Sequence, residues 1–322
     1  MIVKKSKKNT HHPYAKLFEF VFLKKEMAEE FVKNFFPKPL LENLDIASLK
    51  SQRVSYLSPE LSRLYSDVVY TCDYGKNKNK VWITLLFEHK SYYSQNPHLQ
   101  LLGYMLKIWE QQRDNSKPIT PIIPVILYHG EDKWKERKFT DMFTGKIEDD
   151  LKPFIPSFDL QLIDLSKESD EKLKSLKKRF LTNSLLSLKY HKNSKYIRKH
   201  FSFLVEVDND IYRHTMLVYL IENYDISKPE VPILLEGASK NSKSKIMNAI
   251  EAYYAEGEAK GIQKGMKKGM EKGIEKGLHN KNVQAIKKMV EKELPISLII
   301  EIVEVTEEFV KGVMAGTITE ME

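Results

Sequence analysis

The chain has 322 residues, of which 42% are hydrophobic and 30% charged, a composition that excludes a disordered chain and allows a sizeable core. The single cysteine, Cys72, excludes a disulfide framework and a cysteine-based zinc site and suits a reducing, cytoplasmic environment. No apolar run approaches the roughly 18 residues of a membrane span, and the net charge of +8 is compatible with a polyanionic partner.

The N-terminal half of the chain begins with helical and then β-type patterns. The basic N-terminus has no apolar segment behind it, so we expect no signal peptide. Residues 14–36 carry apolar positions at helical spacing and predict one or two amphipathic helices. The proline-containing residues 37–50 predict a break and a turn. Residues 64–74 and 81–87 flank the polar sequence GKNKNK, which predicts a β-hairpin.

A helix and two further strands follow the hairpin. Residues 96–114 predict a helix with Pro97 in its first turn, and its expected apolar face consists of Leu99, Leu102, Met105, Leu106 and Trp109. Residues 119–130 predict a buried strand, and the alternation in residues 158–166 predicts another. This order indicates an α/β domain over residues 1–166. Three amphipathic stretches then predict a helical domain over residues 167–240.

The third predicted region, residues 241–322, contains an internal repeat. The sequence EAKG-IQKG-MKKG-MEKG-IEKG places a glycine at every fourth position from Gly261 to Gly277. A small C-terminal helical segment follows, with Thr306 as an expected N-cap. Each glycine costs a helix about 1 kcal/mol relative to alanine, so residues 257–278 form either a flexible basic tether or a helix that packs against a second copy. The apolar residue of each tetrad favours self-association into a homo-oligomer.

The strand over residues 81–87 ends in three ionisable residues, Glu88, His89 and Lys90. Strand alternation places Glu88 and Lys90 on one face and His89 on the other. A hairpin turn centred on Asn77 would place Asp67 opposite residue 87 and bring its carboxylate near Glu88. Two carboxylates at the mouth of a hairpin favour a magnesium site, and the neighbouring lysine can orient water or stabilise charge on a phosphate.

These motifs carry a family resemblance. The pattern Asp67, Glu88-x-Lys90 followed by a helix resembles the PD-(D/E)XK nuclease superfamily, and Gln100 with Tyr104 matches a Gln-x-x-x-Tyr motif of some of its branches. The sequences SDVVYTCDY, LLFEHKS and PIIPVILYHGEDKW, with the glycine-repeat tail, resemble the Rpn-type recombination-promoting nucleases, which are also described as transposases. One position departs from that family, because Ala15 stands where an acid is often found, and Glu19 is a substitute one turn along.

The resemblance implies a restriction-endonuclease-like core with a helical C-terminal region. It also implies a cytoplasmic, metal-dependent DNA endonuclease tied to recombination or mobile elements. Asp67 and Glu88 would bind Mg²⁺, or another divalent cation such as Mn²⁺ or Ca²⁺, and Lys90 and Gln100 would complete the catalytic set. The alternative is a DNA-binding or oligomeric interaction protein with a degenerate nuclease site. We expect His89 and His129 to be structural and leave Tyr104 open between motif and packing.

Overall fold

The computed structural model describes residues 13–52, 68–76, 79–88, 97–130, 133–135 and 138–321, with the backbone alone described for Glu88 and some other strand residues. The chain divides into two compact units, Met1–Ile250 and Glu251–Glu322. The first unit holds a sheet and most of the helices, and the second holds most of a long helix and the C-terminal segment. The boundaries expected at residues 166 and 240 stay predictions.

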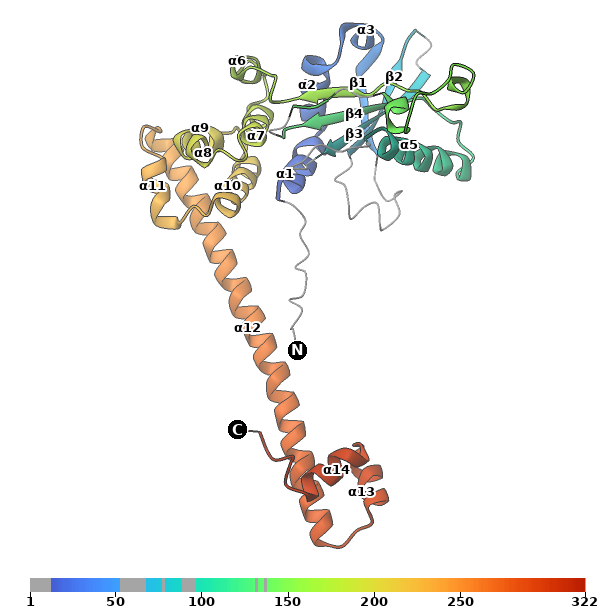
Figure 1. The fold of residues 1–322 in the computed structure, drawn as a ribbon. Coiled ribbons are helices and arrows are strands. Elements are labelled where there is room, and N and C mark those ends of the chain that lie inside the picture. Colours follow the sequence, from blue (N-terminus) through green and yellow to red (C-terminus); the bar gives the residue numbers. More distant parts are fainter. Residues whose placement is uncertain are drawn as a thin grey trace. The chain divides into compact units, whose positions relative to one another are not determined.

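A mixed five-stranded sheet with the order β1-β2-β3-β4-β5 forms the centre of the first unit (Figure 1). The first three strands pair antiparallel, whereas β3, β4 and β5 run parallel. The strands are β1 (Leu44–Gln52), β2 (Val68–Tyr74), β3 (Asn79–Glu88), β4 (Ile122–Tyr128) and β5 (Gln161–Asp164). This mixed α/β arrangement confirms the coarse fold class that the sequence predicts.

Two details of the sheet correct the sequence interpretation. The segment 37–50 was expected to break and turn, but its second half belongs to β1 (Leu44–Gln52), because this part of the chain pairs with β2. The pairing of β2 with β3 is shifted by one residue from the expected register. Val68 pairs with Leu85, whereas a turn centred on Asn77 would pair it with Leu86.

Helices cover both faces of the sheet. On one face, the Tyr70 hydroxyl of β2 donates a 2.7 Å hydrogen bond to the Phe22 carbonyl at the end of α1 (Pro13–Phe22), and α2 (Lys25–Phe35) contacts β1. On the other face, α5 (Pro97–Asp114) packs against Ile126 and Tyr128 of β4. Burial of the sheet between helical layers is the usual solution for parallel strands, whose two faces are both apolar.

The buried face of α5 differs from the expected one. Leu99 and Leu106 are about half exposed, at 53% and 50%. Met105 is buried as expected, and the helix buries Leu101, Tyr104 and Ile108 beside it. Apolar residues occur around most of this helix, so its periodicity does not select one face. The selection comes from the aromatic and branched side chains of β4 onto which α5 packs.

Short helices pack together in the remainder of the first unit and confirm the helical character expected after residue 167. They are α6 (Asp170–Lys174), α7 (Arg179–Lys189), α8 (Ser194–Lys199), α9 (Phe201–Val205), α10 (Asp210–Tyr224) and α11 (Val231–Leu234), whereas the short α3 (Lys38–Leu41) precedes β1. Two hydrogen bonds connect this region to α2: Tyr212 donates to the Glu26 carboxylate at 2.7 Å, and the Lys177 amide donates to the buried Glu30 at 2.7 Å. No described helix is long and apolar enough to cross a membrane.

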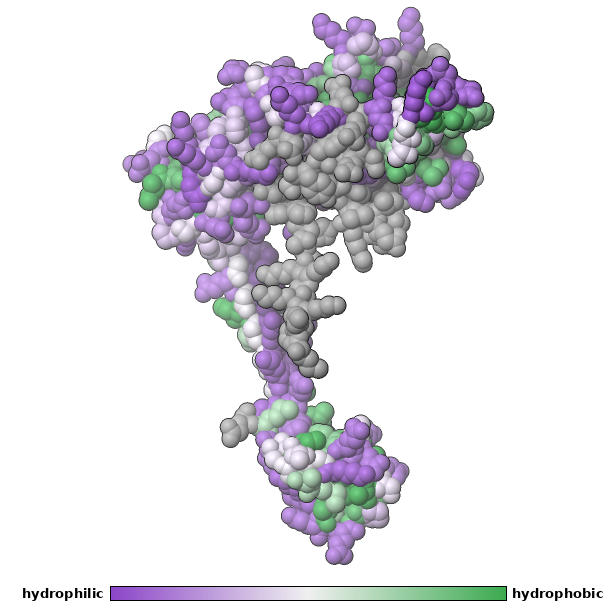
Figure 2. All heavy atoms as spheres, in the orientation of Figure 1, coloured by the Kyte–Doolittle hydropathy of each residue, from purple (hydrophilic) through white to green (hydrophobic). Residues whose placement is uncertain are grey.

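The glycine repeat lies in α12 (Lys240–Glu291), a continuous helix of 52 residues. The repeat's apolar residues are 57% to 71% exposed, and a Cβ added at each repeat glycine would meet nothing within 4 Å. Within the second unit, α13 (Ile296–Val303) and α14 (Glu307–Met314) pack on the end of α12 around Val283 and Ile286. Apolar side chains show on the surface of this unit (Figure 2), and the Thr306 side chain caps α14, as expected.

Candidate active site

The candidate acid Glu88 is the last residue of β3. In the parallel register, Glu88 pairs with Tyr128 of β4, and Tyr128 pairs with Asp164 of β5. Three neighbouring strands therefore end at one level, with two acidic residues flanking a tyrosine. The carboxyl edge of parallel strands is where α/β proteins usually build their sites, because the following loops converge there.

Asp164 is an acid of this edge that the sequence analysis did not single out. Its carboxylate is buried, and Oδ1 accepts hydrogen bonds from the Ser166 amide at 3.0 Å and the Ser166 hydroxyl at 2.7 Å. Oδ2 lies 3.8 Å from the Lys167 ammonium. Two strand spacings, about 10 Å of backbone, separate Asp164 from Glu88. The sequence signal that could have identified Asp164 is its position as an acid near the end of the strand predicted over residues 158–166.

Gln100 is the one predicted catalytic residue whose side chain the structure describes. It lies in the second turn of an 18-residue helix, α5, and its Nε2 is buried without a hydrogen-bond partner in the described structure. A buried amide nitrogen of this kind is rare and needs an explanation, such as a ligand that it binds. Tyr104, one turn later, packs in the core with Leu101, Ile126 and Trp134, which confirms the packing alternative for the tyrosine.

The other predicted site residues are described less fully. Asp67, His89 and Lys90 lie outside the described residues. Glu19, the substitute acid, lies on α1 with an exposed side chain. At Ala15 the structure describes the backbone alone. The metal set of Asp67 and Glu88 and the catalytic roles of Lys90 and Gln100 therefore stay predictions.

The residue that follows β4 anchors this edge to the helical region. His129 is buried, and its Nδ1 lies 3.2 Å from Nδ1 of His191, which follows α7. The His191 Nδ1 also lies 2.9 Å from the Leu188 carbonyl, a geometry in which His191 donates and His129 accepts. His129 therefore has the structural role that the sequence predicts. A side chain at Gly130 would collide with the Tyr128 ring, so glycine is required there.

Within the described ranges, no group of three or more His, Cys, Asp or Glu side chains converges so as to hold a metal ion. The two predicted ligands are both carboxylates, which are the hard oxygen donors that Mg²⁺ prefers.

Comparison with known proteins identifies similar chains. The family model described as "Putative transposase, YhgA-like" matches residues 12–216. The recombination-promoting nuclease RpnD of Escherichia coli O157:H7 is 25% identical over 123 residues, which are 38% of this chain and 46% of RpnD. In Escherichia coli strain K12, RpnA, a recombination-promoting nuclease, is 25% identical over 39% of this chain and 42% of its own length.

A third relative carries a different description. RpnE of Escherichia coli strain K12, described as an inactive recombination-promoting nuclease-like protein, is 24% identical over 38% of this chain and 40% of its own length. The matched segments thus span less than half of each of these three relatives. No solved structure matches the chain.

Proposed function

Because this chain belongs to the YhgA-like transposase family, we propose that it is a metal-dependent DNA endonuclease that hydrolyses phosphodiester bonds in recombination. The recombination-promoting nucleases among its relatives support this activity. The observation that carries the proposal is local. β3 delivers Glu88 to the carboxyl edge of the parallel strands, and the next helix carries a buried, unpartnered amide at Gln100. A PD-(D/E)XK-like core is the fold that we propose for residues 1–166.

The residues of the site have separate roles in this proposal. Asp67 and Glu88 would hold Mg²⁺ or a similar divalent cation. When bound, such a cation lowers the pKa of a water ligand and neutralises charge that develops on phosphate. The Lys90 ammonium would orient the water or stabilise the phosphate as a point charge. The Gln100 Nε2 would donate a hydrogen bond to a phosphate oxygen, which gives this buried donor a partner.

Supercoiled plasmid tests the activity. Purified protein should nick or linearise plasmid with Mg²⁺ and not with EDTA. Asp67→Asn, Glu88→Gln and Lys90→Ala should each slow cleavage by about 10²-fold or more, because each removes a group that acts on the reacting atoms. Glu42→Gln, which removes an exposed carboxylate outside the site, is the matched control. Cleavage at the wild-type rate by all three site variants would show that the assigned site is wrong.

DNA is the partner that this proposal requires, and the net charge of +8 supports it. Phosphate contacts by lysine and arginine release counterions, so the logarithm of the binding constant should fall linearly with the logarithm of the salt concentration. A filter-binding titration in EDTA between 50 and 200 mM salt measures that slope. A flat dependence would exclude a surface dominated by phosphate contacts.

The second candidate function is a DNA-binding or oligomeric interaction protein whose nuclease site has degenerated. The relative RpnE, which is described as inactive, favours it. So does Ala15, which departs from the acid that the family resemblance implies at this position. Calorimetric titration with Mg²⁺ separates the candidates. A nuclease should bind the cation and lose that binding in Asp67→Asn, whereas a degenerate site should show no binding that depends on Asp67.

The glycine repeat supports a further part of the proposal, a homo-oligomer joined through residues 257–278. Its apolar residues recur every four positions, so the exposed stripe winds around α12 by 40° per tetrad. A second copy has the same winding and can follow the stripe, and the glycines leave open space for close approach. Two nuclease domains joined in this way would act on both strands of a duplex.

A further inference from the structure

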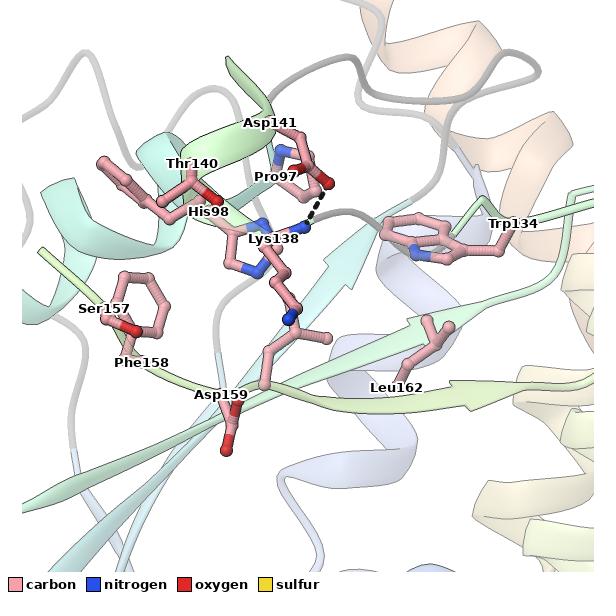
Figure 3. Close-up of a pocket in the computed structure, with 12 residues that line it drawn as sticks. Pro97, His98, Trp134, Lys138, Thr140, Asp141, Ser157, Phe158, Asp159 and Leu162 are labelled. Carbon is pink, nitrogen blue, oxygen red and sulfur yellow. Dashed lines mark hydrogen bonds between the residues drawn. The ribbon is translucent and has the colours of Figure 1, made fainter. Parts of the chain in front are cut away.

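A cavity of about 950 Å³ is lined in part by the first two residues of α5, and Gln100 is not among its lining residues. The residues that line it come from α5, from the loop after β4 and from the segment before β5: Pro97, His98, Trp134, Lys138, Phe139, Thr140, Asp141, Ser157, Phe158, Asp159, Leu160 and Leu162. Figure 3 shows Phe158 and Trp134 at opposite ends of this cavity, with His98 and Lys138 between them. The volume is more than enough to admit a group the size of a nucleotide base.

His98 is the most unusual polar group of the cavity. It occupies the second position of α5, and only 7% of its surface is exposed. It makes no hydrogen bond to another described residue. Its ring contacts Phe158 and Phe139, at centroid distances of 5.6 and 6.4 Å. Burial lowers the pKa of His98, although Asp141 and Asp159 act in the opposite direction. A neutral imidazole therefore faces the cavity with one donor and one acceptor nitrogen.

The charges around the cavity select the class of ligand. Among the described residues that line the cavity, Lys138 contributes one positive charge, whereas Asp141 and Asp159 contribute two negative charges, and His98 is neutral. This balance disfavours a phosphate inside the cavity. It suits an uncharged aromatic group, because carboxylates accept hydrogen bonds from the exocyclic amino groups of bases. The aromatic rings supply surfaces on which a base stacks.

The cavity adjoins the candidate active edge. The Trp134 ring lies 5.0 Å from the Tyr128 ring in an edge-to-face contact, and Tyr128 is the strand neighbour of Glu88. A strand of DNA whose phosphate is held at that edge therefore passes close to the cavity.

We propose that this cavity binds one unstacked base of the DNA strand, held by the aromatic side chains, His98 and Lys138. This inference rests on the proposed nuclease function and assigns it a subsite for a nucleobase. The base leaves its neighbours in the strand, stacks within the cavity and directs its polar edge to His98 and the two carboxylates. The phosphates on either side of it stay outside.

The test compares two labelled probes in EDTA, so that no cleavage occurs. One probe is a fluorescein-labelled single-stranded decamer of deoxycytidine, and the other is an abasic decamer with the same number of phosphates. Their charge is equal, so counterion release cancels in the ratio of dissociation constants measured by anisotropy. Stacking of one base should make the deoxycytidine decamer bind between about fivefold and about 150-fold more tightly.

Three variants assign that ratio to the cavity. Phe158→Leu removes a partly exposed ring but keeps an apolar side chain, Lys138→Gln changes an exposed side chain, and His98→Asn shortens the buried group. Each should bring the ratio toward one, and circular dichroism melts check that each variant folds. Lys146→Gln is the control, because it makes the same charge change at an exposed lysine outside the cavity, and it should keep the wild-type ratio.

Equal binding of the two probes by the wild-type protein would overturn the inference, and so would wild-type ratios in all three folded variants. Glu88→Gln separates this outcome from failure of the nuclease proposal, because it should keep the ratio while losing plasmid cleavage. A protein that cuts no plasmid but keeps the ratio contradicts the nuclease proposal alone. A protein that cuts plasmid but binds both probes equally contradicts the base subsite alone.

Discussion

His129 and His191, 62 residues apart in the sequence, bring their Nδ1 atoms to 3.2 Å in the interior of the first unit. The contact joins the residue that follows β4, beside the candidate catalytic edge, to the residues that follow α7. Two protons cannot occupy the space between these nitrogens, so one ring donates and the other accepts. The pair therefore couples the placement of the sheet edge to that of the helical region.

A double-mutant cycle measures this coupling. His129→Leu and His191→Leu should each lower the free energy of unfolding by about 1–3 kcal/mol, because each removes the polar contact between the two buried rings. The double variant should lose less than the sum, with a coupling energy of about 1 kcal/mol. Urea unfolding gives these values, and Lys195→Ala, at an exposed neighbour in α8, serves as the control. Strict additivity of the two losses would show that the rings do not interact.

Gln100 offers a prediction in which activity and stability move apart. Gln100→Leu removes a buried donor that has no partner, so the free energy of unfolding should stay constant or rise. Cleavage of plasmid should nevertheless slow by about 10²-fold, since a hydrogen bond to the reacting phosphate is lost. Gln111→Leu, on the same helix, should change neither property. A variant that cleaves at the wild-type rate but unfolds more easily would assign Gln100 a structural role instead.

Asp170 predicts how stability depends on pH. Burial raises the pKa of this carboxyl, but hydrogen bonds from Lys189 and Tyr190 and the Lys189 charge outweigh burial, so the pKa is lowered overall. Lys189 donates at 2.6 Å, Tyr190 at 2.8 Å and Tyr196 at 3.2 Å. A carboxyl with a lowered folded-state pKa stabilises the fold above its ordinary value of about 4, and this stabilisation is lost as the pH falls through the lowered pKa.

The substitution Asp170→Asn tests this dependence. At pH 7 it should lower the free energy of unfolding by about 1.5–3 kcal/mol, the contribution of a hydrogen bond to a charged group. The difference from the wild-type protein should shrink as the pH falls below about 4, where the unfolded-state carboxyl takes up a proton. Asp208→Asn, at an exposed carboxylate, is the control. A difference that grows toward low pH would contradict the assigned sign.

Substitution of the repeat glycines of α12 distinguishes a flexible tether from an interface between two copies. Replacing Gly265, Gly269 and Gly273 by alanine adds up to about 3 kcal/mol of helix propensity, and the single chain offers open space at each position. If the glycines permit close packing of two copies, the added methyl groups should weaken the dimer although helicity rises. Sedimentation equilibrium at micromolar concentration measures the assembly. A wild-type chain that sediments as a monomer would remove the homo-oligomer from the proposal.

The sequence alone determined which segments form most of the elements. Apolar alternation on either side of a polar turn predicted β2 and β3, a run of branched residues predicted β4, and helical spacing predicted α1, α2 and α5. These elements are encoded by residues a few positions apart, since side chains recur with a period of two in strands and 3.6 in helices. The position of Glu88 at the end of β3 and the N-cap at Thr306 are likewise encoded by residues close to them in the sequence.

Only the tertiary structure decided which surfaces meet. The buried face of α5 is set by Ile126 and Tyr128 rather than by its own periodicity, and β1 forms because β2 offers it backbone partners. The one-residue register correction and the approach of His129 to His191 likewise depend on residues that are distant in sequence. Such contacts arise when apolar layers close on one another, and the free energy of that packing depends on both partners, which no local pattern contains.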